Sequence, residues 1–124
     1  MRQAVVALNE RDAESFVGLI VQDFVWTTPA ASVEMRTYRG RTGARQFFAE
    51  SGRAWASIEG RPDEIRPVGD LVLMLGEISW RGRPGAVDVT GPLASVVEFE
   101  DGKIKRIRTY RAAAEALAAA GLEG

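Results

Sequence analysis

The sequence contains neither cysteine nor histidine. The absence of cysteine excludes disulfides, thiolate nucleophiles and cysteine-ligated metal sites. The absence of histidine removes imidazole general bases, Ser-His and Cys-His nucleophile activation, and nearly every zinc or iron site. Any proton transfer by this chain therefore requires an Asp, Glu, Tyr or Lys with a shifted pKa, and we expect no metal and no cofactor.

The chain also lacks a charge excess and a long apolar run. Its 16 basic and 17 acidic residues leave a formal net charge of −1, too small to hold the protein on nucleic acid or an anionic membrane. No apolar run approaches the roughly 20 residues of a membrane span, and charged residues between Glu10 and Glu14 interrupt any signal-peptide core. We expect a cytoplasmic protein with no nucleic-acid or membrane partner.

The 124 residues suffice for one domain, which we place at residues 1–124. "FVWTTP" at 24–29 predicts a short strand that ends at a proline, followed by a loop from Ala30 to Arg39. Asp12 and Thr42 are the expected N-caps of the second and third helices. Apolar spacing predicts three N-terminal helices, at 2–9, 12–22 and 43–55.

From residue 56 onwards the apolar period changes to two, which predicts strands. Residues 57–69 are typical of an edge strand, because Pro62 and Pro67 cannot donate to a hydrogen-bond ladder. A helix at 112–122, with Gly121 as its C-cap, closes the chain. Further strands are expected at 70–82, 93–100 and 103–111, with a turn-rich link at 83–92 and an Asp-Gly hairpin turn. Helices followed by antiparallel strands indicate an α+β fold with a sheet curled over helices.

The segment "LVLML" is apolar on both faces of its predicted strand. Leu71, Leu73 and Leu75 face one way, whereas Val72 and Met74 face the other. One face can pack on the protein's own helices, and the other needs a different cover. A second copy of the same sheet is the simplest cover, so we predict a homodimer through the sheet face. The alternative is that the C-terminal helix covers this face.

The order of elements, with "YRGRTGARQFF" after the first strand and "VEFEDGKIKRIRTYR" and "EALAAAGL" at the end, resembles the SnoaL-like branch of the nuclear transport factor 2-like superfamily. The resemblance covers nearly the whole chain. It implies a cone-shaped fold: a strongly bent, mainly antiparallel sheet wraps the N-terminal helices around a central pocket, a C-terminal helix follows, and dimers form through sheets. The first helix is shorter than is usual in the family, so either the cone is more open or the native start lies upstream of Met1.

The superfamily includes ketosteroid isomerases, which use a carboxylate on the first strand, a tyrosine on the first helix and a protonated aspartate on a late strand. The resemblance places Thr28, Ala4 and Ser95 at these three positions. Threonine is no base near pH 7 and alanine donates no hydrogen bond, so we reject ketosteroid isomerase activity. The histidine chemistry of scytalone dehydratase is excluded, and "MLGEISW" lacks the Arg-x-Asp pattern of limonene epoxide hydrolase.

The resemblance also implies which side chains face the pocket. A mostly apolar wall with a few hydroxyls is typical of a small-molecule site, whereas the alternative is a filled core. Thr28, Ser95 and Tyr110 are the expected sources of hydrogen bonds, and Trp80 is either a polar tip at the pocket or rim packing. The predicted pocket residues are Trp26, Thr28, Phe47, Phe48, Met74, Ile78, Ser95, Val97, Ile107, Thr109 and Tyr110.

Charged residues offer weaker candidates. Glu77 is expected to pair with a basic neighbour on the sheet or dimer face rather than to act in catalysis. Glu34 and Asp88 are loop carboxylates for which solvation is favoured over proton transfer. One reading of the basic residues near the last two hairpins is a patch that binds an anion or nucleic acid. These bases are Arg81, Arg83, Lys103, Lys105, Arg106 and Arg108. Glu98, Glu100 and Asp101 lie beside them, however, so that a mutually compensated solvent face is favoured.

The leading hypothesis is therefore a small dimeric protein whose pocket binds a hydrophobic, ring-containing or polyketide-like metabolite. One alternative is an enzyme of the cyclase, isomerase or dehydratase type, which positions a reactive substrate and moves protons through a water or a loop carboxylate. Another is a protein-interaction module that uses the sheet face and has no pocket.

Overall fold

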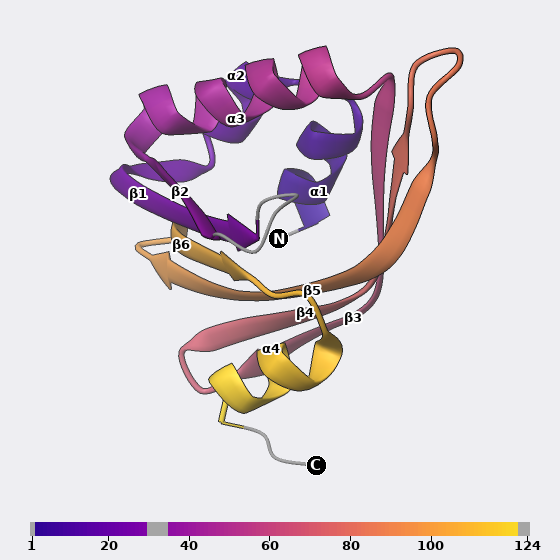
Figure 1. The fold of residues 1–124 in the computed structure, drawn as a ribbon. Helices are drawn as coiled ribbons and strands as arrows, with labels where there is room; N and C mark the ends of the chain where they lie inside the picture. The colour runs from indigo at the N-terminus through magenta and orange to yellow at the C-terminus, as the bar shows by residue number, and fades with distance from the viewer. Residues whose placement is uncertain (1, 30–34, 122–124) are drawn as a thin grey trace.

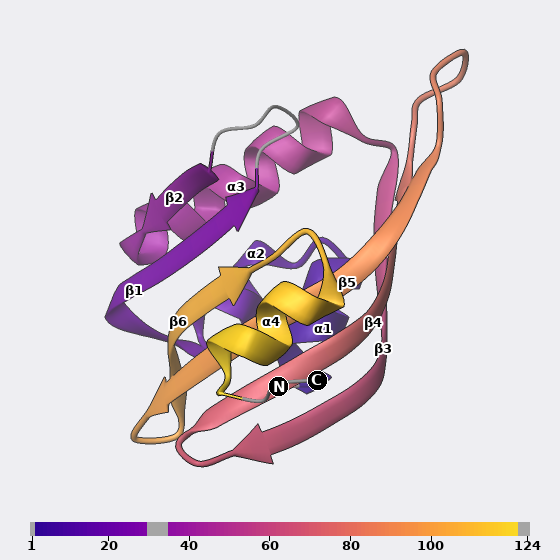
Figure 2. The same ribbon diagram turned by 60° about the horizontal axis from the view of Figure 1, so that its bottom comes forward.

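The computed structural model describes residues 2–29 and 35–121. These residues form one unclosed six-stranded sheet in the order β2-β1-β6-β5-β4-β3. The helices are α1 (Arg2–Asn9), α2 (Ala13–Val17), α3 (Gly40–Ala54) and α4 (Ala113–Ala119), and the strands are β1 (Ile20–Pro29), β2 (Met35–Arg39), β3 (Ser57–Val68), β4 (Leu71–Arg81), β5 (Val89–Glu100) and β6 (Lys103–Thr109). The sheet curls around α1, α2 and α3, whereas α4 lies on the opposite face (Figure 1, Figure 2). The predicted α+β cone is confirmed.

Sheet pairing joins the two ends of the chain. Every neighbouring pair of strands is antiparallel except β1 and β6, which run parallel with Trp26 opposite Ile107. The register shifts at three places: between Ile20 and Val25 in β1, between Pro62 and Glu64 in β3, and between Glu98 and Phe99 in β5. Such bulges bend a strand and increase its twist, so they give the sheet its curl.

Several element bounds differ from those the sequence predicts. The second helix does not reach residue 22, because Gly18 is its C-cap and Ile20 already pairs with Ile104 in the sheet. The predicted N-cap of this helix is confirmed, since Asp12 accepts a 3.1 Å hydrogen bond from the Ser15 backbone N–H. The same acceptor role lowers the pKa of Asp12, chiefly through the Ser15 hydroxyl.

Two predicted connections turn out to contain strand. Residues 30–34 lie outside the described part of the chain, but Met35–Arg39 forms β2 against β1. The helix that follows begins at Gly40, whose φ of 67° makes a sharp strand-to-helix turn, so Thr42 is not an N-cap. Likewise β5 begins at Val89 within the predicted link, because its first residues pair with the long strand β4.

The N-terminal sheet edge is fixed to α3 by one carboxylate. Glu50 accepts hydrogen bonds from the Tyr38 hydroxyl at 2.9 Å, from Arg36 at 2.9 Å and from Gln46 at 3.0 Å. These donors, Gln46 first and Tyr38 second, lower the pKa of Glu50. Burial raises the pKa of Tyr38, so its hydroxyl remains a donor at neutral pH. The ionised Glu50 therefore links α3 to β2.

We expect Glu50→Gln to lower the free energy of unfolding by about 1 kcal/mol at pH 7, because it weakens charge-assisted hydrogen bonds at a site that is 28% exposed. The lowered pKa means that this stabilisation is complete above the ordinary glutamate pKa and is lost as pH falls through the folded value. The difference between wild type and variant should therefore shrink in urea titrations below about pH 4. Glu100→Gln, at the exposed hairpin, is the control, and a difference that stays constant with pH would contradict the linkage.

The outer face of β4 and β5 is covered by α4. Ala116 and Ala120 pack on Leu73, Ala94 and Val96, all of which are buried. The C-terminal helix therefore covers this sheet face, which was the alternative to a second copy of the sheet. The homodimer is not tested by this packing and stays a prediction. Small alanine side chains allow the helix to lie close to the strands.

Several charged residues on the sheet are paired, as the sequence predicts for Glu77. Glu77 lies directly opposite Arg61 in the β3–β4 ladder and forms an ion pair with it. In the last hairpin, Arg106 lies 3.3 Å from Glu98, and Lys105 lies 3.6 Å from Glu100. Asp88 accepts a 2.8 Å hydrogen bond from the Gly82 N–H and so stabilises the β4–β5 loop. Glu34 lies outside the described residues. No helix in the described part of the chain is long and apolar enough to span a bilayer.

Candidate functional site

A cavity lies between the concave face of the sheet and the three N-terminal helices. The volume of the cavity is about 70 Å³, and the unfilled space around it, with its open mouth included, is about 590 Å³. Its wall comes from α1, α2, α3 and from every strand except β2. The lining residues are Ala4, Val5, Leu8, Phe16, Trp26, Thr28, Phe47, Ile58, Met74, Ile78, Trp80, Leu93, Ser95, Ile107 and Thr109.

Strand alternation explains why these side chains meet. Met74, Ile78 and Trp80 are separated by even steps along β4, so they point to the same face of the sheet. Ser95 lies opposite both Met74 and Thr109 in the adjacent ladders, which places three cavity residues side by side on β4, β5 and β6. The helices close the other side through the apolar stripe of α1 and through Phe47 of α3.

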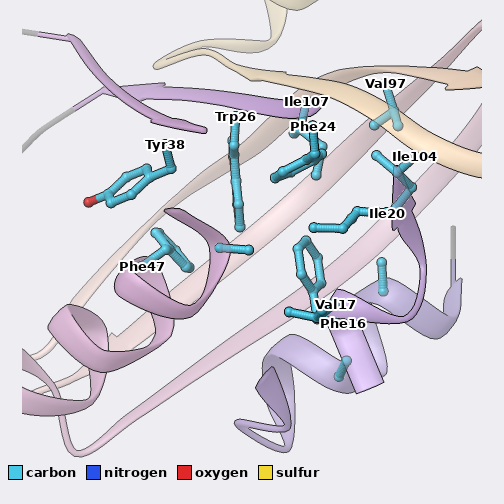
Figure 3. Packing of buried hydrophobic residues seen from close by; sticks show 13 residues of the cluster. Phe16, Val17, Ile20, Phe24, Trp26, Tyr38, Phe47, Val97, Ile104 and Ile107 are labelled. Carbon is cyan, nitrogen blue, oxygen red and sulfur yellow. The ribbon is translucent and has the colours of Figure 1, made fainter. Parts of the chain in front are cut away.

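Aromatic rings form one wall of the cavity. The ring centroids of Trp26 and Phe47 are 4.2 Å apart, and those of Phe16 and Trp26 are 5.5 Å apart in a stacked arrangement. Trp26 lies between Phe47 and Phe24, and Phe16 approaches from the helical side (Figure 3). Because rings at these separations hold one another in place, this aromatic side of the cavity is firmly packed.

The polar groups of the cavity form a short chain across three strands. The Trp26 indole Nε1–H donates to Thr109 Oγ1 at 3.2 Å, and Thr109 Oγ1 lies 3.1 Å from Ser95 Oγ. Ser95 is 2% exposed, and it is the one buried polar residue among residues 2–29 and 35–121. Thr28 adds another hydroxyl to the lining, and in the described chain it has no side-chain hydrogen-bond partner.

No side chain that is ionised near pH 7 lines the cavity in the described part of the chain. The hydroxyls of Thr28, Ser95 and Thr109 have no basicity in this range, so the wall holds no candidate general base. Nor does any group of three or more Asp or Glu side chains gather as a metal site among the residues the structure describes. The arrangement can hold and orient a molecule by shape and by hydrogen bonds.

The structure brings most of the predicted pocket residues together. Three of them lie elsewhere: Val97 is fully buried in the core beside Ile104, and Phe48 packs on Phe16 with ring centroids 5.4 Å apart. Tyr110 follows the end of β6 and packs in the cluster under α4, on the outer face. Those at the cavity are Trp26, Thr28, Phe47, Met74, Ile78, Ser95, Ile107 and Thr109.

Other lining residues were not among the predicted pocket residues. Val5 and Leu8 come from the apolar stripe of α1, and Leu93 comes from the inner face of β5. Ile58 lies opposite Trp80 in the β3–β4 ladder, so the alternation that places Trp80 inside also places Ile58 there. Phe16 enters because α2 is short and turns its ring toward Trp26. The helix or sheet face on which each of these residues lies can be inferred from the apolar period of the sequence. The depth of each residue along the cone cannot.

Comparisons with known proteins agree with this geometry. Residues 1–107 match the model of the SnoaL-like domain family. Among curated proteins, none matches the chain significantly. A ketosteroid isomerase-fold protein from Catenulispora acidiphila, solved with trimethylamine, is 16% identical with a TM-score of 0.79, and the match covers 98% of this chain and 91% of that one.

Two further solved structures are similar. An NTF2-like protein of unknown function from Burkholderia pseudomallei is 22% identical with a TM-score of 0.78, over 94% of this chain and 91% of the other. A putative SnoaL-like polyketide cyclase from Shewanella denitrificans is 20% identical with a TM-score of 0.73, over 87% and 84% of the two chains. At these identities the likeness establishes the fold.

Proposed function

Since this chain belongs to the SnoaL-like domain family, we propose that it binds a small hydrophobic, ring-containing or polyketide-like metabolite in the cavity of the cone. The observation that carries the proposal is the lining itself. It is apolar apart from a few hydroxyls and the Trp26 N–H, and it includes the firm aromatic surface of Trp26, Phe47 and Phe16. Flat rings gain contact area on such a wall with little loss of conformational freedom.

A cyclase-type enzyme is the second candidate. It is favoured by the similar fold of the putative polyketide cyclases from Shewanella denitrificans and Sinorhizobium meliloti. In such a reaction this cavity would act by holding a flexible substrate in one conformation. A water or a carboxylate from outside the described lining would move the proton. Binding is common to both candidates, so it is the property to test first.

Thr28→Leu is expected to weaken binding of a small aromatic probe, 1-indanone, at least about ten-fold, because the larger side chain fills cavity space. Thr27→Leu is the matched control, since Thr27 is the neighbouring residue of β1 and lies opposite Thr37 and Arg108 outside the cavity lining. Affinities are measured by ¹H–¹⁵N NMR titration, which also locates the probe. Equal affinities of the two variants, or shifts away from the cavity, would overturn the proposed site.

Native mass spectrometry of freshly purified protein complements this titration. An adduct that is lost on denaturation would supply the mass of the natural ligand. The same spectrum reports whether the protein forms the homodimer, which remains a proposal.

A further inference from the structure

The Trp26–Thr109–Ser95 chain points to the chemical class of the ligand. We infer that the cavity selects an uncharged molecule that carries a carbonyl or similar hydrogen-bond acceptor, and that this acceptor binds at Thr109 or Ser95. The inference rests on the proposed binding function and deepens it. Its basis is a count of hydrogen-bond donors at the one polar cluster of the wall.

Three hydrogens are available within this cluster: one on the indole nitrogen and one on each hydroxyl. Two internal hydrogen bonds join the three groups and consume two of these hydrogens. Neither hydroxyl has another partner among residues 2–29 and 35–121. One hydroxyl hydrogen is therefore left over whichever way the Thr109–Ser95 bond runs.

The leftover donor is placed at the cavity wall, since Trp26, Thr109 and Ser95 all line the cavity. Ser95 is 2% exposed and Thr109 is partly buried, so bulk water has little access to the leftover donor on either residue. A buried donor without an acceptor is costly, and a ligand oxygen that accepts its hydrogen removes that cost. The indole N–H also polarises the Thr109 hydroxyl, because hydrogen bonds in a chain strengthen one another.

The charge of the lining sets the second requirement. No side chain that is ionised near pH 7 lines the cavity in the described part of the chain. A carboxylate or ammonium group of a ligand would lose its hydration there without meeting an opposite charge, which is strongly unfavourable. A neutral carbonyl loses less hydration and finds a donor at Thr109 or Ser95. Uncharged ketones, esters and quinones are thus the favoured class.

Three probes of one skeleton test the inference in wild-type protein. They are 1-indanone, 1-methyleneindane, in which CH₂ replaces the carbonyl oxygen, and indane-1-carboxylate. Infrared spectra of ¹³C-carbonyl-labelled 1-indanone report the hydrogen bond directly, since the bound band should lie below its position in an alkane solvent. NMR titrations give the three affinities, and we expect the carboxylate to bind at least about ten-fold more weakly than the ketone.

A triple variant, Ser95→Ala, Thr109→Val and Trp26→Phe, removes all three hydrogens while keeping the wall apolar. We expect it to lower the preference for 1-indanone over 1-methyleneindane by about three- to ten-fold relative to wild type. If this variant does not fold, the infrared band of 1-indanone bound to Thr28→Val, which lacks the remaining cavity hydroxyl, decides the matter.

The outcomes separate the two proposals. An alkane-like band for the bound ketone, an unchanged preference in the folded triple variant, or tighter binding of the carboxylate would overturn the acceptor inference while leaving a binding cavity. If neither neutral probe binds in the cavity, the proposed function itself is wrong. A lowered band together with a weakly bound carboxylate supports both.

Discussion

Replacement of Gly76 by valine is expected to destabilise the protein by about 3 kcal/mol or more and to abolish folding of much of the expressed chain. Gly76 lies opposite Pro62 at the bulge of β3, and a Cβ atom there would overlap Arg61 O. It would also stand 2.7 Å from the Pro62 Cα and 2.8 Å from the Asp63 N. All three atoms are backbone, so relief requires the two strands to separate.

The position of Gly76 makes this effect important for the site. Gly76 lies between Met74 and Ile78 on β4, both of which line the cavity. Close approach of two backbones at a glycine is a common way to bend a sheet, so this residue helps to set the curvature of the cone. A valine here would both unpair the bulge and change the shape of the cavity wall.

Gly91→Val is the matched control for Gly76→Val. Gly91 is also a strand glycine, lies opposite Ile78 in the β4–β5 ladder, and has open space where its Cβ would stand. We expect a change within about 0.5 kcal/mol for this control. Urea denaturation followed by circular dichroism measures both variants. Equal midpoints would mean that the close approach at Gly76 is absent from the folded protein.

The sequence predicts those features that depend on short-range chemistry. The Asp12 cap, the pairing of Glu77 with a basic neighbour and the position of Met74 and Ile78 on one face of their strand follow from one helix turn or one ladder step. Each needs only the local backbone period and the type of side chain. The resemblance to the SnoaL-like branch added the strongly bent sheet that wraps the N-terminal helices, which local patterns do not contain.

Other features depend on long-range packing. Residues 35–39 read as polar loop because Arg36 and Arg39 flank Tyr38, and only pairing with β1 makes them a strand. Leu93, Ser95 and Val97 share one face of β5, but Val97 lies too deep in the core to reach the cavity. The two-residue period of a strand shows on which face of the sheet a residue lies. The depth of that residue along the cone depends on where the helices close the cone. Cavity volume is set by all these packing contacts together.

Trp26→Ala is expected to lower the free energy of unfolding by about 3–5 kcal/mol, because it removes the largest ring of the buried cluster. Trp26 is 7% exposed and has ring neighbours at 4.2 Å (Phe47), 5.5 Å (Phe16) and 6.3 Å (Phe24). The alanine also opens one side of the cavity and leaves Thr109 without its indole donor. The wall then loses both its central ring and its anchored hydroxyl, so probe binding should fall with stability.

Trp55→Ala is the control for Trp26→Ala. It separates the loss of packing in the buried aromatic cluster from the loss of a tryptophan as such. Trp55 is half-buried, and its aromatic neighbour in the described chain is Trp80, with ring centroids 5.6 Å apart. We expect this variant to lower the free energy of unfolding by only about 1–2 kcal/mol, since folding buries less apolar surface at this position. Urea titration of both variants gives the comparison. If Trp26→Ala cost no more than Trp55→Ala, the aromatic wall would not be the rigid element of the site, and a binding cavity in this cone would lose its main physical support.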